Sequence, residues 1–160
     1  MGNATGIIIG QILGAGDLKR ARDEDTKLIA FSVFCCIITG LIMFCLAPLF
    51  PQIYNTSETV KVLAASFIRI VGLCMPIYGF VNAAYFTLRS GGKTIITFLF
   101  DGGFMWAFAI PIVYCLSRFT AMTIVPIYLI SQLTDFVKCI IGFVLVKRGT
   151  WLHNMAVEEE

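Results

Sequence analysis

Long apolar stretches alternate with short polar ones along this chain. Four of them hold at most two charged residues each: 28–50, 68–88, 94–116 and 122–146. A helix needs about 20 apolar residues to cross the hydrocarbon core of a bilayer, so each stretch predicts one transmembrane helix. A fifth apolar stretch, 2–16, has about three-quarters of that length and predicts a partial span.

The composition agrees with an integral membrane protein. Of the 160 residues, 58% are hydrophobic and 14% are charged, whereas soluble domains carry about 25% charged residues. We therefore expect an all-α polytopic bundle at residues 1–152, followed by an acidic cytoplasmic tail at 153–160.

Motifs of soluble enzymes, metal sites and nucleic-acid binding are missing from the sequence. The six cysteines all lie in apolar stretches without C-x-x-C spacing, and the single histidine is His153. No zinc set and no Walker A motif can be formed from these residues. The basic cluster at 19–22 is balanced by Asp17, Asp23, Glu24 and Asp25, which does not favour nucleic acid. We predict that the protein is not an enzyme and has no cofactor or metal.

Basic residues are concentrated in the connections on one side of the predicted membrane. Eight of them follow the stretches 2–16, 68–88 and 122–146, and three lie on the other side. The positive-inside rule places the eight, and the C-terminus, in the cytoplasm of a multi-pass protein of the cell membrane. The partial span then begins inside the bilayer, where a charged amino group costs several kcal/mol. Either this stretch lies flat at the interface, or the chain is the end of a longer protein; the spacing of its glycines favours the second.

Glycine recurs at every fourth position of the partial span, at Gly2, Gly6, Gly10 and Gly14. On a helix this spacing forms a smooth ridge that another membrane helix can approach closely. We predict that this glycine ridge packs against a neighbouring helix.

Polar residues inside the spans are candidates for function because they are costly in lipid. Asp101 could be a protonatable or cation-binding carboxylate that faces a cavity, or a helix-packing carboxylate that hydrogen-bonds neighbouring backbone; we expect it to be the only acid in the spans without an ion-pair partner. Asp135 and Lys138 are three residues apart on one helix face, so we predict an intramembrane ion pair, with a proton relay as the alternative. Gln132 extends that face by one turn.

The stretch 68–88 carries a second set of candidates. Tyr78 and Asn82 are four residues apart and therefore neighbours on a helix, where they could line a cavity for aromatic cations. Proline lies in or beside every full span, which predicts bent helices; rocking transporters use such helices, and many other membrane proteins have them.

Four segments resemble, in their order and spacing, the transporters of the MATE (multidrug and toxic compound extrusion) family. Residues 10–17 with Ala21-Arg22 resemble the loop after the family's eighth helix, and 88–94 resemble the loop between its tenth and eleventh helices. Asp101 with Trp106, Ile110 and Pro111 is similar to the eleventh helix. Lys138 and Gly142, with 147–151, are similar to the closing helix and tail.

The resemblance implies that residues 1–152 are part of the C-terminal lobe, about helices 8–12 of twelve. It implies export of small cationic or amphipathic compounds by alternating access, in exchange for protons or sodium ions, together with a missing N-terminal lobe. The coupling ion stays open, because the family's proton-coupling acid lies on its first helix. One sodium-coupled branch has an acid on the tenth helix, whereas residues 72–88 hold no carboxylate.

Three functions follow from these observations. The first is a fragment of a MATE-type antiporter, inactive without the missing lobe, in which Asp101, Asn82 and Tyr78 line the cavity. The second is a lipid-linked saccharide flippase of the same superfamily, for which the spans offer only Lys138 and Arg69 as basic residues. The third is a small non-transporting membrane subunit that docks through its glycine ridge.

Overall fold

A computed structural model of the chain describes residues 2–92 and 94–152. Its α-helices are α1 (Gly2–Gly14), α2 (Leu18–Leu46), α3 (Glu58–Ser90), α4 (Thr94–Phe98), α5 (Ile110–Phe119) and α6 (Ile124–Arg148). Two π-helices, η2 (Leu99–Gly103) and η3 (Met105–Ala109), connect α4 to α5, and a short 3-10 helix, η1 (Phe50–Ile53), follows α2. The predicted all-α class is confirmed. The predicted tail at 153–160 lies outside the described residues.

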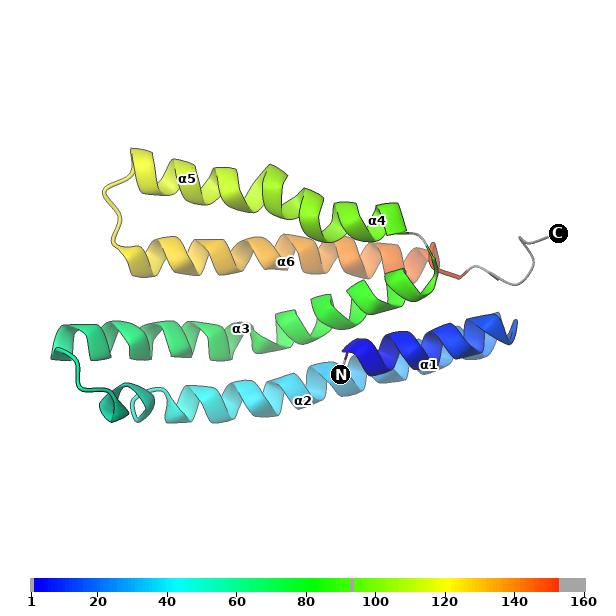
Figure 1. Ribbon diagram of the computed structural model, residues 1–160, viewed down its shortest axis with the longest axis horizontal. Coiled ribbons are helices and arrows are strands. Elements are labelled where there is room, and N and C mark those ends of the chain that lie inside the picture. Colours follow the sequence, from blue (N-terminus) through cyan, green and yellow to red (C-terminus); the bar gives the residue numbers. More distant parts are fainter. Residues whose placement is uncertain (1, 93, 153–160) are drawn as a thin grey trace.

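The long helices lie side by side, and the chain reverses direction between them (Figure 1). Helices α2 and α3 form one pair, and α6 forms a second pair with the segment from α4 to α5. Helix α3 packs against both α2 and α6 and so joins the two pairs, while α1 lies against α2 and α3. The candidate residues on α3, Tyr78 and Asn82, are thus carried by the central helix of the bundle.

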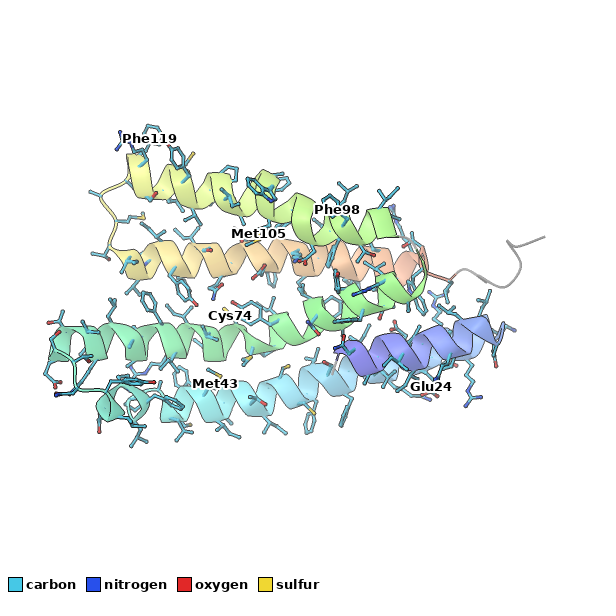
Figure 2. All side chains as sticks on the ribbon, viewed as in Figure 1. Glu24, Met43, Cys74, Phe98, Met105 and Phe119 are labelled. Atoms are coloured by element: carbon cyan, nitrogen blue, oxygen red, sulfur yellow. The ribbon has the colours of Figure 1, made fainter. Side chains whose placement is uncertain are left out.

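Four helical segments are long and apolar enough to cross a membrane: Leu18–Leu46, Glu58–Ser90, Ile95–Phe119 and Ile124–Arg148. Large apolar side chains cover their outer faces (Figure 2), and several are highly exposed, such as Leu41 at 64%, Trp106 at 75% and Phe119 at 78%. Soluble monomers rarely expose such extensive apolar surface. The predicted number of full spans is therefore confirmed.

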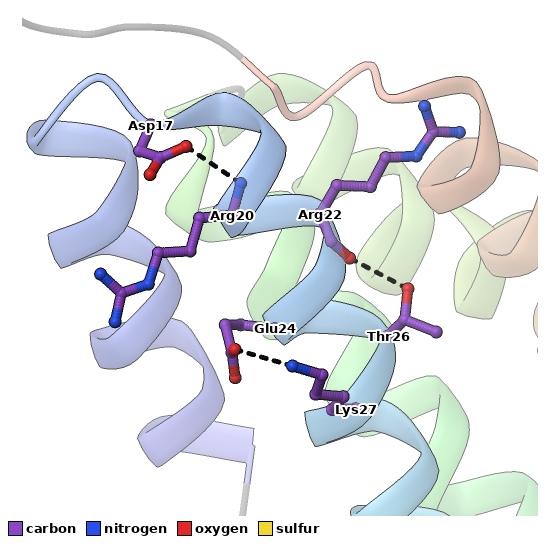
Figure 3. A network of polar contacts seen from close by, with 6 residues as sticks. All are labelled: Asp17, Arg20, Arg22, Glu24, Thr26 and Lys27. Carbon is purple, nitrogen blue, oxygen red and sulfur yellow. Dashed lines mark hydrogen bonds and ion pairs between the residues drawn. The ribbon is translucent and has the colours of Figure 1, made fainter.

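The boundaries of the second helix differ from the prediction. The apolar stretch predicts a helix over residues 28–50, but α2 runs from Leu18 to Leu46. Asp17 caps its start, because the side-chain Oδ1 accepts a hydrogen bond from the backbone N–H of Arg20 at 3.1 Å (Figure 3). Seven of the ten residues 18–27 are charged. The membrane-spanning part of α2 therefore begins near Leu28, and the preceding turns extend beyond the apolar layer.

The third full span is a continuous helical segment whose centre is not a regular α-helix. A single α-helix was expected over 94–116, but the two π-helices η2 and η3, which have wider turns, lie between α4 and α5. Pro111 lacks a backbone N–H, and its ring would clash with the carbonyl of the residue four positions earlier in a regular α-helix. The wider π turns precede this proline and contain Asp101. Such turns are frequent at functional sites.

Helix α3 is longer than the predicted span 68–88 and begins at Glu58. Figure 1 shows a bend halfway along it, where Pro76 interrupts the hydrogen-bond ladder. Beyond the bend, α3 turns from α2 towards α6. Both halves of α3 keep contact with both neighbours, because Phe67 packs against Tyr128 of α6 and Thr87 is bonded to Asp25 of α2.

The connections with most basic residues lie together at one end of the bundle. Figure 1 shows the turn between α1 and α2, the end of α3 and the end of α6 at the same side, and the other two connections at the opposite side. This alternation is what the sequence predicted from its spans. That the basic end faces the cytoplasm stays a prediction from the charge distribution.

Candidate functional site

An ion pair within the membrane region joins α6 to η2. The Lys138 ammonium donates a hydrogen bond to Asp101 Oδ1, and the Lys138 side chain is only 12% exposed. Lys138 Nζ also lies 5.3 Å from the centre of the Phe100 ring, within the range of a cation–π contact. An isolated charge in lipid costs several kcal/mol, so this pairing allows both groups to remain there.

The prediction that Lys138 forms its ion pair with Asp135 is therefore wrong. Lys138 pairs with Asp101, and Asp135 forms no ion pair within the described parts of the chain. The physical reason is the position of the π-helix, which brings a second carboxylate within reach of the flexible lysine side chain. Asp135 still interacts electrostatically with Lys138, and also with Tyr78 and Cys74 of α3. Asp101, expected to be unpaired, is the partner.

A line of polar side chains follows the contact between α3 and α6. Gln132 Nε2 donates a hydrogen bond to the Tyr128 hydroxyl at 2.9 Å, one turn away on α6. The Tyr128 ring packs edge-to-face against Phe67 of α3, with 4.7 Å between the ring centres. Tyr78 interacts electrostatically with both Asp135 and Tyr128. We call Tyr78, Tyr128, Gln132 and Asp135 the α3–α6 polar strip.

The structure thus separates the candidates that the sequence grouped. Tyr78 and Gln132 belong to the α3–α6 polar strip, and Asp101 lies on η2. Asn82 faces α1 instead, where its side-chain oxygen is the nearest atom to a methyl group built on Gly2. Although both residues lie on α3, Asn82 faces α1 and Tyr78 interacts with residues of α6.

The glycine ridge is half confirmed. Gly2 and Gly6 face α3, and a methyl group added at Gly6 would lie 3.5 Å from Phe86 Cβ. Gly10 and Gly14 have no atom of a neighbouring segment within 4 Å of such a group. The ridge therefore packs against α3 at its beginning only.

A close crossing of α2 and α3 at glycines was not predicted. At the crossing of α2 and α3, a methyl group on Gly72 would lie 2.9 Å from the Gly40 carbonyl oxygen, and one on Gly79 would lie 2.7 Å from Cys36 Sγ. Both distances are too short for real atoms, so only glycine fits. The sequence signal was the separation of Gly72 and Gly79 by seven residues, about two helical turns.

A buried polar contact at the basic end was also missed. Asp25 at the start of α2 is 1% exposed and accepts a hydrogen bond from the Thr87 hydroxyl of α3 at 2.6 Å. Nearby, Arg22 Nη2 donates to the backbone oxygen of Lys147 at 3.1 Å, which ties α2 to the end of α6. The sequence placed Asp25 in a charge-balanced loop, and nothing in that pattern singled it out.

An apolar cavity of about 380 Å³ lies between the π-helices and α6. Its lining includes Leu99, Phe100, Phe104, Phe108, Ile141 and Leu145. Because Phe100 also lies beneath the Lys138 ammonium, the cavity borders the Asp101–Lys138 pair. The described residues that line the cavity carry no polar side chain, so they suit the apolar part of a ligand, and the nearby charges are those of the Asp101–Lys138 pair.

Comparison with known proteins gives one match. The model of the family described as MatE matches residues 1–116, from α1 to the middle of α5. Neither the search of curated proteins nor the search of solved structures found a match.

Proposed function

The chain belongs to the MatE family, and from this premise we propose that it works as the C-terminal part of a secondary antiporter. The transporter would export organic cations and amphipathic drugs across the cell membrane in exchange for protons or sodium ions. The observation that carries the proposal is the family match over residues 1–116, joined to four helices able to span a membrane. Transport requires the N-terminal lobe as a partner.

In this proposal Asp101 and the apolar cavity act together. The carboxylate supplies a negative charge that a cation can approach, and the neighbouring aromatic walls bind the apolar part of the substrate. Lys138 competes with the cation for Asp101. Binding of a substrate or coupling ion would therefore release Lys138 towards Asp135, one turn earlier on α6.

The flippase alternative is less well supported. A lipid-linked pyrophosphate requires free basic groups, but Lys138 is engaged with Asp101. The subunit alternative draws support from one observation, the open half of the glycine ridge at Gly10 and Gly14. A stable 160-residue product that copurifies with a different membrane protein would favour it.

Ethidium transport in everted membrane vesicles tests the proposal. We expect vesicles with this chain and a separately expressed N-terminal lobe to accumulate ethidium when a proton or sodium gradient is imposed. Vesicles with either part alone should not. The gradient that drives ethidium accumulation, of protons or of sodium ions, then identifies the coupling ion. Transport by the chain alone would contradict the need for a second lobe, and equal ethidium distribution with and without gradients would contradict antiport.

A further inference from the structure

The contact between Asp25 and Thr87 has an unusual chemical environment. Asp25 is 1% exposed and Thr87 is fully buried, yet both come from helix ends near the basic side of the bundle. Asp25 lies before Leu28, outside the membrane-spanning part of α2. Carboxylates are rarely buried without a cationic partner, and Asp25 forms no ion pair with the described residues.

The hydroxyl of Thr87 is within hydrogen-bond distance of two acceptors. Its Oγ1 lies 2.6 Å from Asp25 Oδ1 and 3.0 Å from the backbone oxygen of Ala83. A hydroxyl has a single proton to donate. When Asp25 is ionised, Thr87 donates to the carboxylate and leaves its contact to Ala83. When Asp25 is protonated, the carboxyl donates to Thr87 Oγ1, and Thr87 donates to Ala83. The protonated form makes both contacts, but the charge-assisted bond from Thr87 to the ionised carboxylate is the stronger one, so Thr87 on balance favours the ionised form.

A cavity gives the carboxyl group a route to solvent. It measures about 200 Å³, lies between α2 and α6, and is lined by Asp25 together with Arg22, Lys147 and Trp151. Water in such a cavity could deliver a proton to Asp25 without unfolding the helix pair.

The charged groups around Asp25 are few. Arg22 on α2 and Lys147 on α6 share its cavity. Helix α1, which also packs against α2, has no charged residue. On α3, Arg89 lines a different hollow together with Asn3 and Gly6. Burial raises the pKa of Asp25 to about 6, and the hydrogen bond from Thr87 acts in the opposite direction.

We propose that Asp25 is a proton-binding site, with Thr87 as its hydrogen-bond partner, that exchanges protons with water through the cavity between α2 and α6. One proton moves from water to an Asp25 oxygen, and the hydrogen bond between Asp25 and Thr87 reverses its direction. The site is separate from Asp101 and goes beyond the proposed antiport, because it holds whatever the transported compound is.

Infrared difference spectroscopy of the chain in lipid nanodiscs tests this site. As the pH falls through about 6, we expect the C=O stretching band of a protonated carboxyl to appear. Asp25→Asn should remove this band. The matched control is Asp23→Asn, which makes the same charge change on the exposed face of α2. A band that persists in Asp25→Asn, or a wild-type carboxyl that titrates only near its usual pH of about 4, would overturn the proposal.

A second pair of variants tests the role of Thr87 and does not depend on the folding of Asp25→Asn. Thr87→Val removes the hydrogen bond that favours the ionised form, so the titration midpoint should move to higher pH. Thr39→Val, which removes an exposed hydroxyl bonded to the Cys35 backbone oxygen farther along α2, should leave it unchanged. An unmoved midpoint in Thr87→Val would exclude Thr87 as the partner. Neither readout involves transport, so failure here leaves the antiport proposal intact.

The same site predicts a pH dependence of stability. The pKa of Asp25 is higher in the folded chain than its ordinary value of 3.8. The folded state therefore binds the proton more tightly, and stability should rise as the pH falls from about 7 to about 5. Asp25→Asn should weaken this rise, whereas Asp23→Asn should preserve it. An equal rise in the two variants would contradict proton binding at Asp25.

Discussion

Gly40→Ala should destabilise the bundle by about 2 kcal/mol, although alanine favours helices over glycine by about 1 kcal/mol. A methyl group at Gly40 would overlap the backbone carbonyl oxygen of Gly72 and lie 2.9 Å from Met75 Cβ. Backbone atoms cannot rotate away, so α2 and α3 would have to separate along their whole contact. Unfolding in mixed micelles, followed by circular dichroism, measures the loss.

Gly10→Ala provides the matched control for this prediction. It adds the same methyl group to a helical glycine, but nothing of a neighbouring segment lies within 4 Å. We expect it to be neutral or to stabilise the chain by up to about 1 kcal/mol, from helix propensity alone. Equal effects of the two substitutions would show that α2 and α3 do not cross at Gly40.

Lys138→Leu should cost about 3 kcal/mol of stability in a bilayer. It leaves Asp101 without its partner and removes the cation nearest to Asp135. An unpaired charge in this region carries a penalty of that order. Arg148→Leu, at the exposed end of α6, removes a basic residue of the same helix and should have little effect.

A double-mutant cycle separates the pair from other effects of Lys138. Combining Asp101→Leu with Lys138→Leu removes both charges, so the double variant should recover part of the stability lost in Lys138→Leu. If Asp101→Leu lowers the stability of the Lys138→Leu variant by as much as it lowers that of the wild type, the two side chains do not interact.

The spans could be predicted from the sequence because lipid imposes a simple rule on composition and length. Each of the four apolar stretches corresponds to one long helix. The helix ends were less predictable, because capping by Asp17 extends α2 through a highly charged segment. The π-helices before Pro111 were unpredictable as well, since the proline signals a disturbance but not its form.

The candidate site was predicted as a set of residues but not as a set of contacts. Asp101, Asp135 and Lys138 were identified because charges are costly in lipid. Spacing along one helix suggested the partner of Lys138, whereas the neighbouring helix supplied it. Asp25 was missed for a similar reason: its burial depends on Thr87, which lies 62 residues away in the sequence. Periodicity within a helix cannot reveal contacts of this kind.

Ion-driven ethidium transport by the Asp101→Asn variant tests most directly whether Asp101 takes part in antiport. The measurement uses everted vesicles that contain the chain with its N-terminal lobe, and Asp23→Asn serves as the control. We predict that Asp101→Asn strongly lowers gradient-driven transport at normal expression, while Asp23→Asn transports like the wild type. Unchanged transport by Asp101→Asn would exclude this carboxylate as a coupling residue and contradict the role proposed for the Asp101–Lys138 pair.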